Sequence, residues 1–154
     1  MMRHARFILI AAMATIFMPL QARADTDFTG YWAQADFNNP CSNLFGFLLK
    51  ADGSANADWV ETKWNRAKNA NEFHKGSRDG RWSAKDGRLH LAIVEVERDP
   101  KVLKLFDKTQ PVTKMTNVDA TVAPDGKKLN ATVKAQNIEQ KVFTFKCVYN
   151  RDKQ

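Results

Sequence analysis

Few residues in this chain have the types and spacing that suit catalysis. Glu95 and Glu97 stand two apart in an extended segment, so their carboxylates share one strand face, a geometry that acid–base catalysis can use. The alternative is a solvated strand face whose charge is balanced by Arg98 and nearby lysines. His74 and His90 have no second histidine at metal-ligand spacing, and the chain has no Gly-x-Ser-x-Gly elbow and no glycine-rich phosphate loop. We therefore expect a protein that is not an enzyme, with no metal site and no cofactor.

A basic and aromatic stretch over residues 63–88 is a better candidate for function. Its charges suit an anionic partner, and tryptophan and arginine dominate binding hot spots. Its polar part, residues 65–77, is expected to be a long loop or an irregular strand end, where binding function tends to lie. The alternative is that the tryptophans belong to the core and the charges solvate a loop. The side chains expected to contact a ligand or partner are Trp59, Trp64, Arg66, Lys68, Phe73, Lys75 and Tyr31.

The first 24 residues have the features of a secretory signal. Two arginines precede an apolar run over residues 7–18, which is shorter than the roughly 20 residues that span a bilayer. Residues 22–24, Ala-Arg-Ala, provide the small residues that precede a cleavage site. We expect cleavage between Ala24 and Asp25, a periplasmic or secreted location, and no transmembrane segment in the mature chain. The alternative is a retained N-terminal anchor.

Residues 25–154 are about one domain's worth of chain, and we expect a single domain. The full chain has a formal net charge of +7, and loss of the three arginines of the signal leaves +4. A nucleic-acid-binding protein usually concentrates a stronger positive field, so no nucleic acid partner is expected.

The two cysteines, Cys41 and Cys147, both follow the expected cleavage site, and thiols of exported proteins oxidise. We predict that they form a disulfide, which in the chain-entropy model stabilises the fold by about 3–5 kcal/mol. The alternative is two buried free thiols.

Alternating apolar and polar residues predict about eight short strands and one helix. The sequence Asp99-Pro100 predicts a helix start, so a short helix is expected over residues 100–108. Four Asp-Gly dipeptides, which begin at residues 52, 79, 86 and 125, favour tight hairpin turns. The strands are expected over residues 28–37, 44–50, 55–64, 81–84, 88–98, 112–123, 128–135 and 141–149.

Within residues 88–98 the apolar positions change parity. Leu89, Leu91 and Ile93 are odd, whereas Val94 and Val96 are even. A β-bulge near Ile93 and Val94, or a strand buried on both faces, would explain the change.

The predicted fold is all-β: a small antiparallel up-and-down β-barrel of about eight strands with one short helix and a Cys41–Cys147 disulfide. An immunoglobulin-like sandwich carries its disulfide between strands in its middle. Here the bridge ties the end of the first strand to the last strand, which suits neighbours in a closed barrel.

Gly30-Tyr31-Trp32 resembles the Gly-x-Trp motif that opens the first strand of lipocalins and related calycin barrels. In that group the tryptophan packs under the closed end of the barrel against an arginine near the end of the last strand. The resemblance therefore implies these structural roles for Trp32 and Arg151. The chain is also similar, more loosely, to periplasmic metalloprotease-inhibitor barrels, whose inhibitory segment precedes the barrel.

Ligand-binding barrels use their open mouth. We therefore expect an exported, non-enzymatic binding protein that holds a small apolar or amphipathic ligand at the barrel mouth, in a cavity of at least roughly 300 Å³. The alternative is a periplasmic inhibitor or immunity protein that blocks an anionic envelope protein through the basic, aromatic loop. Such an inhibitor can have a filled core and an exposed aromatic patch.

Overall fold

The computed structural model describes residues 26–36, 41 and 43–152, without the side chains of residues 61 and 62. The expected signal peptide and its cleavage site lie outside the described residues, as does the predicted end of the first strand at Phe37. Within the described ranges, no helix is long and apolar enough to cross a membrane.

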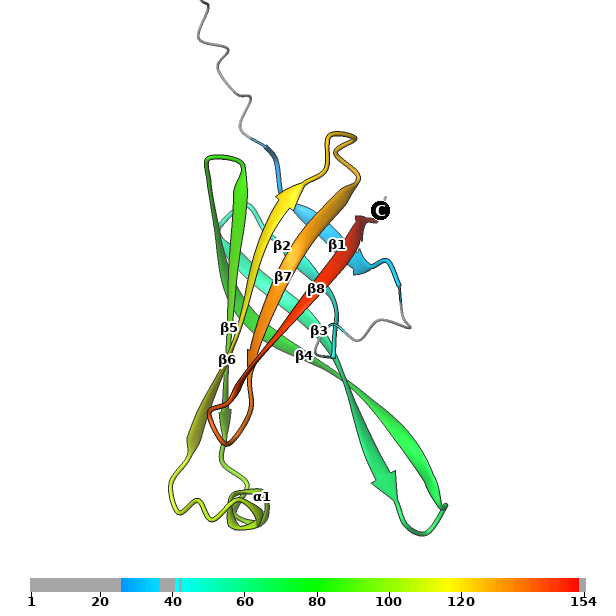
Figure 1. Ribbon diagram of the computed structural model, residues 1–154, viewed down its shortest axis with the longest axis vertical. Coiled ribbons are helices and arrows are strands. Elements are labelled where there is room, and N and C mark those ends of the chain that lie inside the picture. The colour runs from blue at the N-terminus through cyan, green and yellow to red at the C-terminus, as the bar shows by residue number, and fades with distance from the viewer. Residues whose placement is uncertain (1–25, 37–40, 42, 153–154) are drawn as a thin grey trace, which may run out of the picture.

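Eight antiparallel strands form a closed barrel in which each strand pairs with its neighbours in sequence (Figure 1). This arrangement confirms the prediction of an all-β, up-and-down barrel with one short helix. The elements are β1 (Gly30–Gln34), β2 (Leu44–Leu49), β3 (Ser54–Asn65), β4 (Ala70–Lys85), β5 (Arg88–Glu97), α1 (Pro100–Leu105), β6 (Val112–Val122), β7 (Lys128–Gln136) and β8 (Val142–Arg151).

The barrel closes where β1 pairs with β8, through a ladder that sets Trp32 opposite Arg151. The predicted disulfide is present: Cys41, which follows β1 in the chain, is bonded to Cys147 on β8, and both cysteines are buried. The expectation that the first and last strands are neighbours, joined by this bridge, is therefore confirmed.

A buried tryptophan fills one end of the barrel, which we call the closed end. The indole N–H of Trp32 donates to the Phe28 carbonyl at 2.8 Å, and the Arg151 guanidinium lies 4.6 Å from the Trp32 ring centroid. Arg151 also donates to the Asp27 carbonyl. The contact that the lipocalin resemblance implied for Trp32 and Arg151 is thus present.

The core occupies the closed end and the middle of the barrel. On β8 the phenol of Tyr149 is buried and donates to the Leu44 carbonyl at 3.2 Å, and burial raises the pKa of this phenol. The largest other buried side chains are Trp32, Phe28, Phe47, Leu44, Leu49, Leu89, Leu91, Ile93, Leu129, Val118 and Val133. Apolar burial on this scale is the main favourable contribution to folding.

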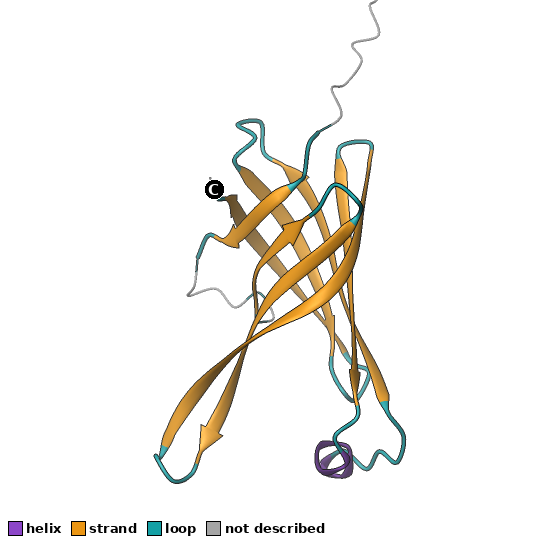
Figure 2. Ribbon diagram, turned by 180° about the vertical axis from the view of Figure 1, so that it is seen from behind, coloured by secondary structure: helices purple, strands orange, loops and turns teal. Residues whose placement is uncertain are grey.

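The expected long loop over residues 65–77 is wrong. These residues form the end of β3, a tight turn and the start of β4, in an unbroken register from Ser54↔Arg81 to Asn65↔Ala70. Figures 1 and 2 show this hairpin projecting beyond the barrel, so both of its faces meet water and no apolar alternation is needed. Near its turn, Asn65 and Lys68 donate to the Glu72 carboxylate at 2.9 and 2.8 Å.

The Asp79-Gly80 dipeptide does not form the expected turn, because it lies inside β4. Gly80 faces Ile93 of β5 across the ladder, and a Cβ at Gly80 would lie 2.9 Å from the Ala92 carbonyl oxygen. Glycine at this position therefore permits a close approach of two strands.

Both explanations offered for the change of parity in residues 88–98, a β-bulge near Ile93 and Val94 or a strand buried on both faces, are wrong. β5 pairs with β6 in unbroken register from Arg88↔Thr121 to Glu97↔Val112. Val94 is exposed, whereas Glu95 continues the inward-facing row that Ile93 belongs to. The face of the strand does not change; the chemistry of the barrel interior does.

The helix α1 begins as predicted. The Asp99 carboxylate accepts from the backbone N–H of Lys101 at 2.9 Å, and Pro100 occupies the first turn. The helix ends at Leu105, earlier than the expected residue 108, and Asp107 has a φ of +55°, which is outside the right-handed helical region.

The outer face of the barrel contains one tight contact, between Tyr31 and Gly46. The Tyr31 phenol crosses Gly46 and donates to the Asp58 carboxylate at 2.5 Å. Burial and the neighbouring Asp58 raise the pKa of Tyr31 to about 12. A Cβ at Gly46 would lie 2.5 Å from the Tyr31 hydroxyl and 2.8 Å from the Trp32 carbonyl oxygen.

We predict that Gly46→Ala lowers the free energy of unfolding by about 1–3 kcal/mol, because the backbone oxygen cannot withdraw without disturbing the β1–β2 ladder. Gly76→Ala is the matched control, since a Cβ there has no heavy atom within 4 Å. Denaturant unfolding of both variants measures the difference. Equal midpoints for the two variants would contradict the close contact.

Candidate ligand-binding site

A pocket of about 440 Å³ opens at the end of the barrel opposite the closed end. This end, which we call the mouth, carries α1, the β3–β4 turn and the β7–β8 turn (Figure 1). One part of the pocket wall is apolar, formed by Ile93, Val102, Phe106, Ile138, Phe143 and Phe145. Another part is charged, formed by Lys63, Arg78, Glu95, Glu97 and Lys114 beside the ring of Trp59.

The pocket exists because the inward-facing rows of neighbouring strands change from apolar to charged at the same level. Ile93 faces Thr116 across the β5–β6 ladder, and the next inward pair is Glu95 and Lys114. Ile93 and Thr116 are buried, so they mark the floor of the pocket. Above this floor the inward-facing side chains of β5 and β6 are charged and do not close over the interior as the apolar ones below do.

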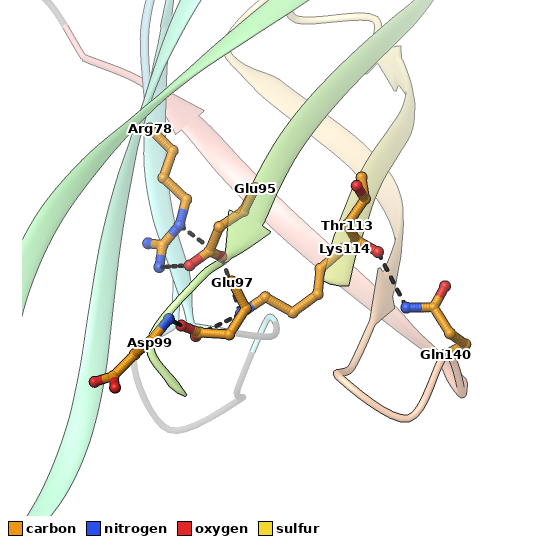
Figure 3. Close-up of polar contacts among 7 residues, drawn as sticks. All are labelled: Arg78, Glu95, Glu97, Asp99, Thr113, Lys114 and Gln140. Atoms are coloured by element: carbon orange, nitrogen blue, oxygen red, sulfur yellow. Dashed lines mark hydrogen bonds and ion pairs between the residues drawn. The ribbon is translucent and has the colours of Figure 1, made fainter. Parts of the chain in front are cut away.

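The charged wall is a connected cluster (Figure 3). Arg78 makes a two-point contact with Glu95, from Nε to Oε2 and from Nη2 to Oε1, each at 2.9 Å. Lys114 Nζ lies 3.4 Å from the same Glu95 Oε2 and 4.0 Å from Oε2 of Glu97. The Arg78 guanidinium also lies 4.5 Å from the centroid of the Trp59 ring, within the range of a cation–π contact.

The cluster fixes the ionisation of Glu95. Burial alone would raise its pKa, but the hydrogen bonds and positive charges of Arg78 and Lys114 outweigh burial and hold the pKa below its usual value. The side chain of Glu95 is 29% exposed and that of Arg78 is 16% exposed, so the pair is more shielded than a surface ion pair. The carboxylate is therefore charged at neutral pH.

The Arg78–Glu95 contact spans a gap in the wall of the barrel. The β4–β5 ladder ends at Gly80↔Ile93, and beyond this point β4 pairs only with β3. In the same register, Arg78 and Glu95 would form the next pair on the inner face. A side-chain ion pair thus continues the connection where the two backbones separate (Figure 3).

The structure separates the residues that the sequence suggested for binding. Trp59 lines the pocket. Trp64 and Phe73 are exposed on one face of the β3–β4 hairpin, since Phe73 faces residue 62 across the ladder. Tyr31 is not among the pocket residues, because its phenol is held by Asp58 on the outer face.

The three basic residues proposed for the loop lie on the same hairpin. Arg66 and Lys68 belong to its turn, and Lys75 on β4 faces Val60 on β3. All three are exposed, and Lys68 is paired with Glu72. The hairpin therefore carries the predicted combination of aromatic and basic side chains, but at a distance from the pocket floor.

The sequence interpretation selected none of the five charged pocket residues as site residues: Lys63, Arg78, Glu95, Glu97 and Lys114. Glu95 and Glu97 were weighed as an acid–base pair or a solvated face, and the structure shows them at the pocket, Glu95 in contact with Arg78 and Lys114. Simple alternation through β5, continued past Ile93, would have placed both carboxylates inside the barrel.

His74 and His90 are not among the residues that line the pocket. His74 is on β4, in the projecting hairpin, and its Nε2 lies 3.7 Å from Glu72 Oε2. His90 Nδ1 is 2.8 Å from Asp119 Oδ1 on the outer face, with Ser83 opposite His90 on the other side. Both side chains of the pair are about half exposed, as in an ordinary surface pair, and Ser83 makes no hydrogen bond to His90 in the described structure. No group of three or more His, Cys, Asp or Glu among the described residues is placed to hold a metal ion.

Fold and pocket together define a small, disulfide-linked β-barrel with a ligand-sized pocket at its mouth. Comparison with known proteins finds no matching family model, no matching curated protein and no matching solved structure. Function therefore has to be argued from the site itself.

We predict that Glu95→Gln lowers the free energy of unfolding at pH 7 by about 1–3 kcal/mol, because Arg78 loses a charged partner. A carboxyl whose folded pKa is lowered stabilises the fold above its unfolded pKa of about 4.3 and loses this contribution as pH falls through the folded value. The difference between the variant and the parent protein should therefore shrink below pH 4 to 5 and disappear in stronger acid.

The matched control is Glu139→Gln, which removes an exposed ion pair to Lys141 and should change stability by less than about 0.5 kcal/mol. Urea unfolding across the pH range measures both effects. A pH-independent cost for Glu95→Gln would show that its charge is not what stabilises the cluster.

Proposed function

We propose that this protein is a non-enzymatic carrier that holds a small amphipathic ligand at the mouth of a lipocalin-like barrel. The observation that supports the proposal is the pocket, in which an apolar wall lies beside a partly buried ionic cluster. Its volume, about 440 Å³, falls within the range of roughly 300–1,000 Å³ that small-molecule sites occupy.

The lining favours a ligand with an apolar body and a polar head. Phe106, Phe143 and Phe145 offer aromatic surface for the apolar part. The two carboxylates of the cluster are balanced by Arg78 and Lys114, so the cluster carries no net charge. A neutral polar or zwitterionic head group, which can form hydrogen bonds with both signs of charge, therefore fits this wall.

Export to the periplasm, or secretion, is part of the proposal. It is supported by the Cys41–Cys147 disulfide, because disulfides persist in oxidising compartments and are rare where thiols are kept reduced. The N-terminal sequence supports it independently, through the features of a cleaved signal over residues 1–24.

A second candidate function is inhibition of an anionic envelope protein. The exposed aromatic pair Trp64 and Phe73 on a hairpin with Arg66, Lys68 and Lys75 favours it. An inhibitor of this kind would not need the pocket. Native mass spectrometry of material recovered from a periplasmic extract separates the two functions, since a carrier retains a small molecule and an inhibitor retains a stoichiometric protein.

We predict that Thr116→Phe lowers the affinity for dansyl-undecanoic acid, an amphipathic fluorescent probe, about tenfold or more, because the new ring fills the pocket floor. Thr113→Phe is the matched control: the same exchange is made on the same strand, at an exposed position outside the pocket. Fluorescence titration measures affinity, and circular dichroism verifies the fold of each variant.

A milder variant, Ala135→Met, fills the pocket from β7 if Thr116→Phe folds poorly. Failure of the parent protein to bind the probe, or equal binding by the Thr116→Phe and Thr113→Phe variants, would contradict the carrier function.

A further inference from the structure

Exposed apolar side chains gather toward the mouth, and the four most exposed of them lie on or next to three projections. Figures 1 and 2 show the β3–β4 turn, α1 and the β7–β8 turn at the same end of the barrel. Among the exposed large apolar side chains in the described part of the chain, only Val148 lies in the closed half of the barrel. The most exposed are Leu105 at 79%, Phe73 at 73%, Val142 at 60% and Trp64 at 56%.

Positive charge gathers at the same end. Residues 59–78, 94–116 and 136–145, which we call the mouth half, contain eleven Lys or Arg and seven Asp or Glu. The remaining described residues contain nine of each. The positive excess of the described chain therefore lies entirely in the mouth half, where Lys101, Lys104 and Lys108 lie within four residues of the exposed Leu105 in the sequence.

We propose that the mouth half docks on an anionic lipid membrane. Side chains such as Trp64, Phe73 and Leu105 insert favourably at the boundary between head groups and acyl chains. Lysines on long apolar stems reach the anionic head groups around them, and each contributes a favourable interaction that salt weakens. The combination of apolar tips and surrounding lysines is the composition that such an interface requires.

A folded protein partner fits these observations less well. The four most exposed of these side chains belong to the β3–β4 hairpin, α1 and the start of β8, and Figures 1 and 2 show the β3–β4 turn, α1 and the β7–β8 turn as separate projections of the backbone. A folded partner would need a separate pocket for each of the three projections. A lipid interface is fluid and can accommodate all three at once. Capture of a protein is therefore an outcome of the experiment and not the proposal.

Docking in this orientation would turn the pocket toward the membrane. The β4–β5 ladder ends at Gly80↔Ile93, so toward the mouth these two strands are no longer joined by backbone hydrogen bonds. The side chains of Arg78 and Glu95 span the gap between them there. A ligand with an acyl or aromatic body could then pass between bilayer and pocket with little exposure to water. Only this last step rests on the proposed carrier function; the docking itself does not.

Vesicle flotation tests the docking, with the protein as recovered from expressing cells and its N-terminus read by mass spectrometry. Vesicles of phosphatidylcholine with about one-third phosphatidylglycerol are compared with pure phosphatidylcholine, at roughly 0.1 M and 0.5 M NaCl. We expect binding to the anionic vesicles only, and weaker binding at the higher salt concentration.

Charge-reversed variants locate the surface. Lys101→Glu with Lys104→Glu should weaken vesicle binding about tenfold or more, because two attractive charges at the mouth become repulsive. The matched pair Lys127→Glu with Lys128→Glu makes the same change at the β6–β7 turn and should leave binding unchanged.

The apolar contacts have their own variants and readout. Phe73→Ser with Leu105→Ser should reduce binding, whereas Val148→Ser in the closed half should not. Lipids brominated along the acyl chain should quench the fluorescence of Trp64, and Trp64→Phe should remove most of this quenching, since Trp32 is buried and Trp59 and Trp82 are packed against the core.

Equal binding to neutral vesicles, equal loss in the two charge-reversed pairs, or absence of vesicle binding would overturn the proposal. Retention of an envelope protein by the mouth half in the absence of vesicle binding would also overturn it, in favour of a protein partner. Binding of vesicles without binding of the dansyl probe would support the docking and contradict the carrier function. Binding of the probe without binding of vesicles would support the carrier function and contradict the docking.

Discussion

Closure of the sheet through β1 and β8 is the constraint on which the pocket depends. Once β8 pairs with β1, each strand has an inner and an outer face, and alternate residues are assigned to one or the other. The Cys41–Cys147 disulfide holds this seam over a sequence separation of 106 residues, and Arg151 holds it again by covering Trp32. Without the seam, Glu95 and Phe145 would lie on an open sheet and no pocket would form between them.

The inner face changes in chemistry along the barrel axis, and this change decides where the core ends. Leu89, Leu91 and Ile93 continue inward as Glu95 and Glu97 on the same strand. Charges this close to a core are unfavourable unless they are paired, and the two-point contact with Arg78 together with Lys114 provides the pairing. Because two carboxylates are paired with two basic side chains, the cluster has no net charge. Its charged side chains take the place of apolar ones that would fill the mouth, and this leaves room for a ligand.

The sequence predicted the global fold better than the site. Alternation, turn residues and two cysteines that follow an expected export signal were sufficient to predict a barrel of about eight strands with the first and last strands side by side. The Gly-x-Trp resemblance predicted the contact of Trp32 with Arg151. The β3–β4 hairpin was missed because a ribbon exposed on both faces has no apolar period. The sequence did not show that Glu95 and Glu97 face the interior, because an inner face is identified by apolar residues and these two are charged. The partner of Glu95, Arg78, is also 17 residues away in sequence, so the pairing could not be read from neighbouring residues.

The pocket and the exposed apolar surface are built from the same strand ends, because alternation sends neighbouring residues to opposite faces. On β3, Trp59 lines the pocket and Trp64 is exposed; on β8, Phe145 lines the pocket and Val142 is exposed. In each of these two pairs, one residue lines the pocket and the other belongs to the exposed surface. Substitutions at these positions can therefore change one surface without the other. Because the strand ends are shared, a membrane that contacts the outer positions also lies next to the opening that the inner positions form. For the proposed carrier, a membrane docked at the outer positions would bring a poorly soluble ligand close to the pocket, so that the ligand would not have to diffuse through water.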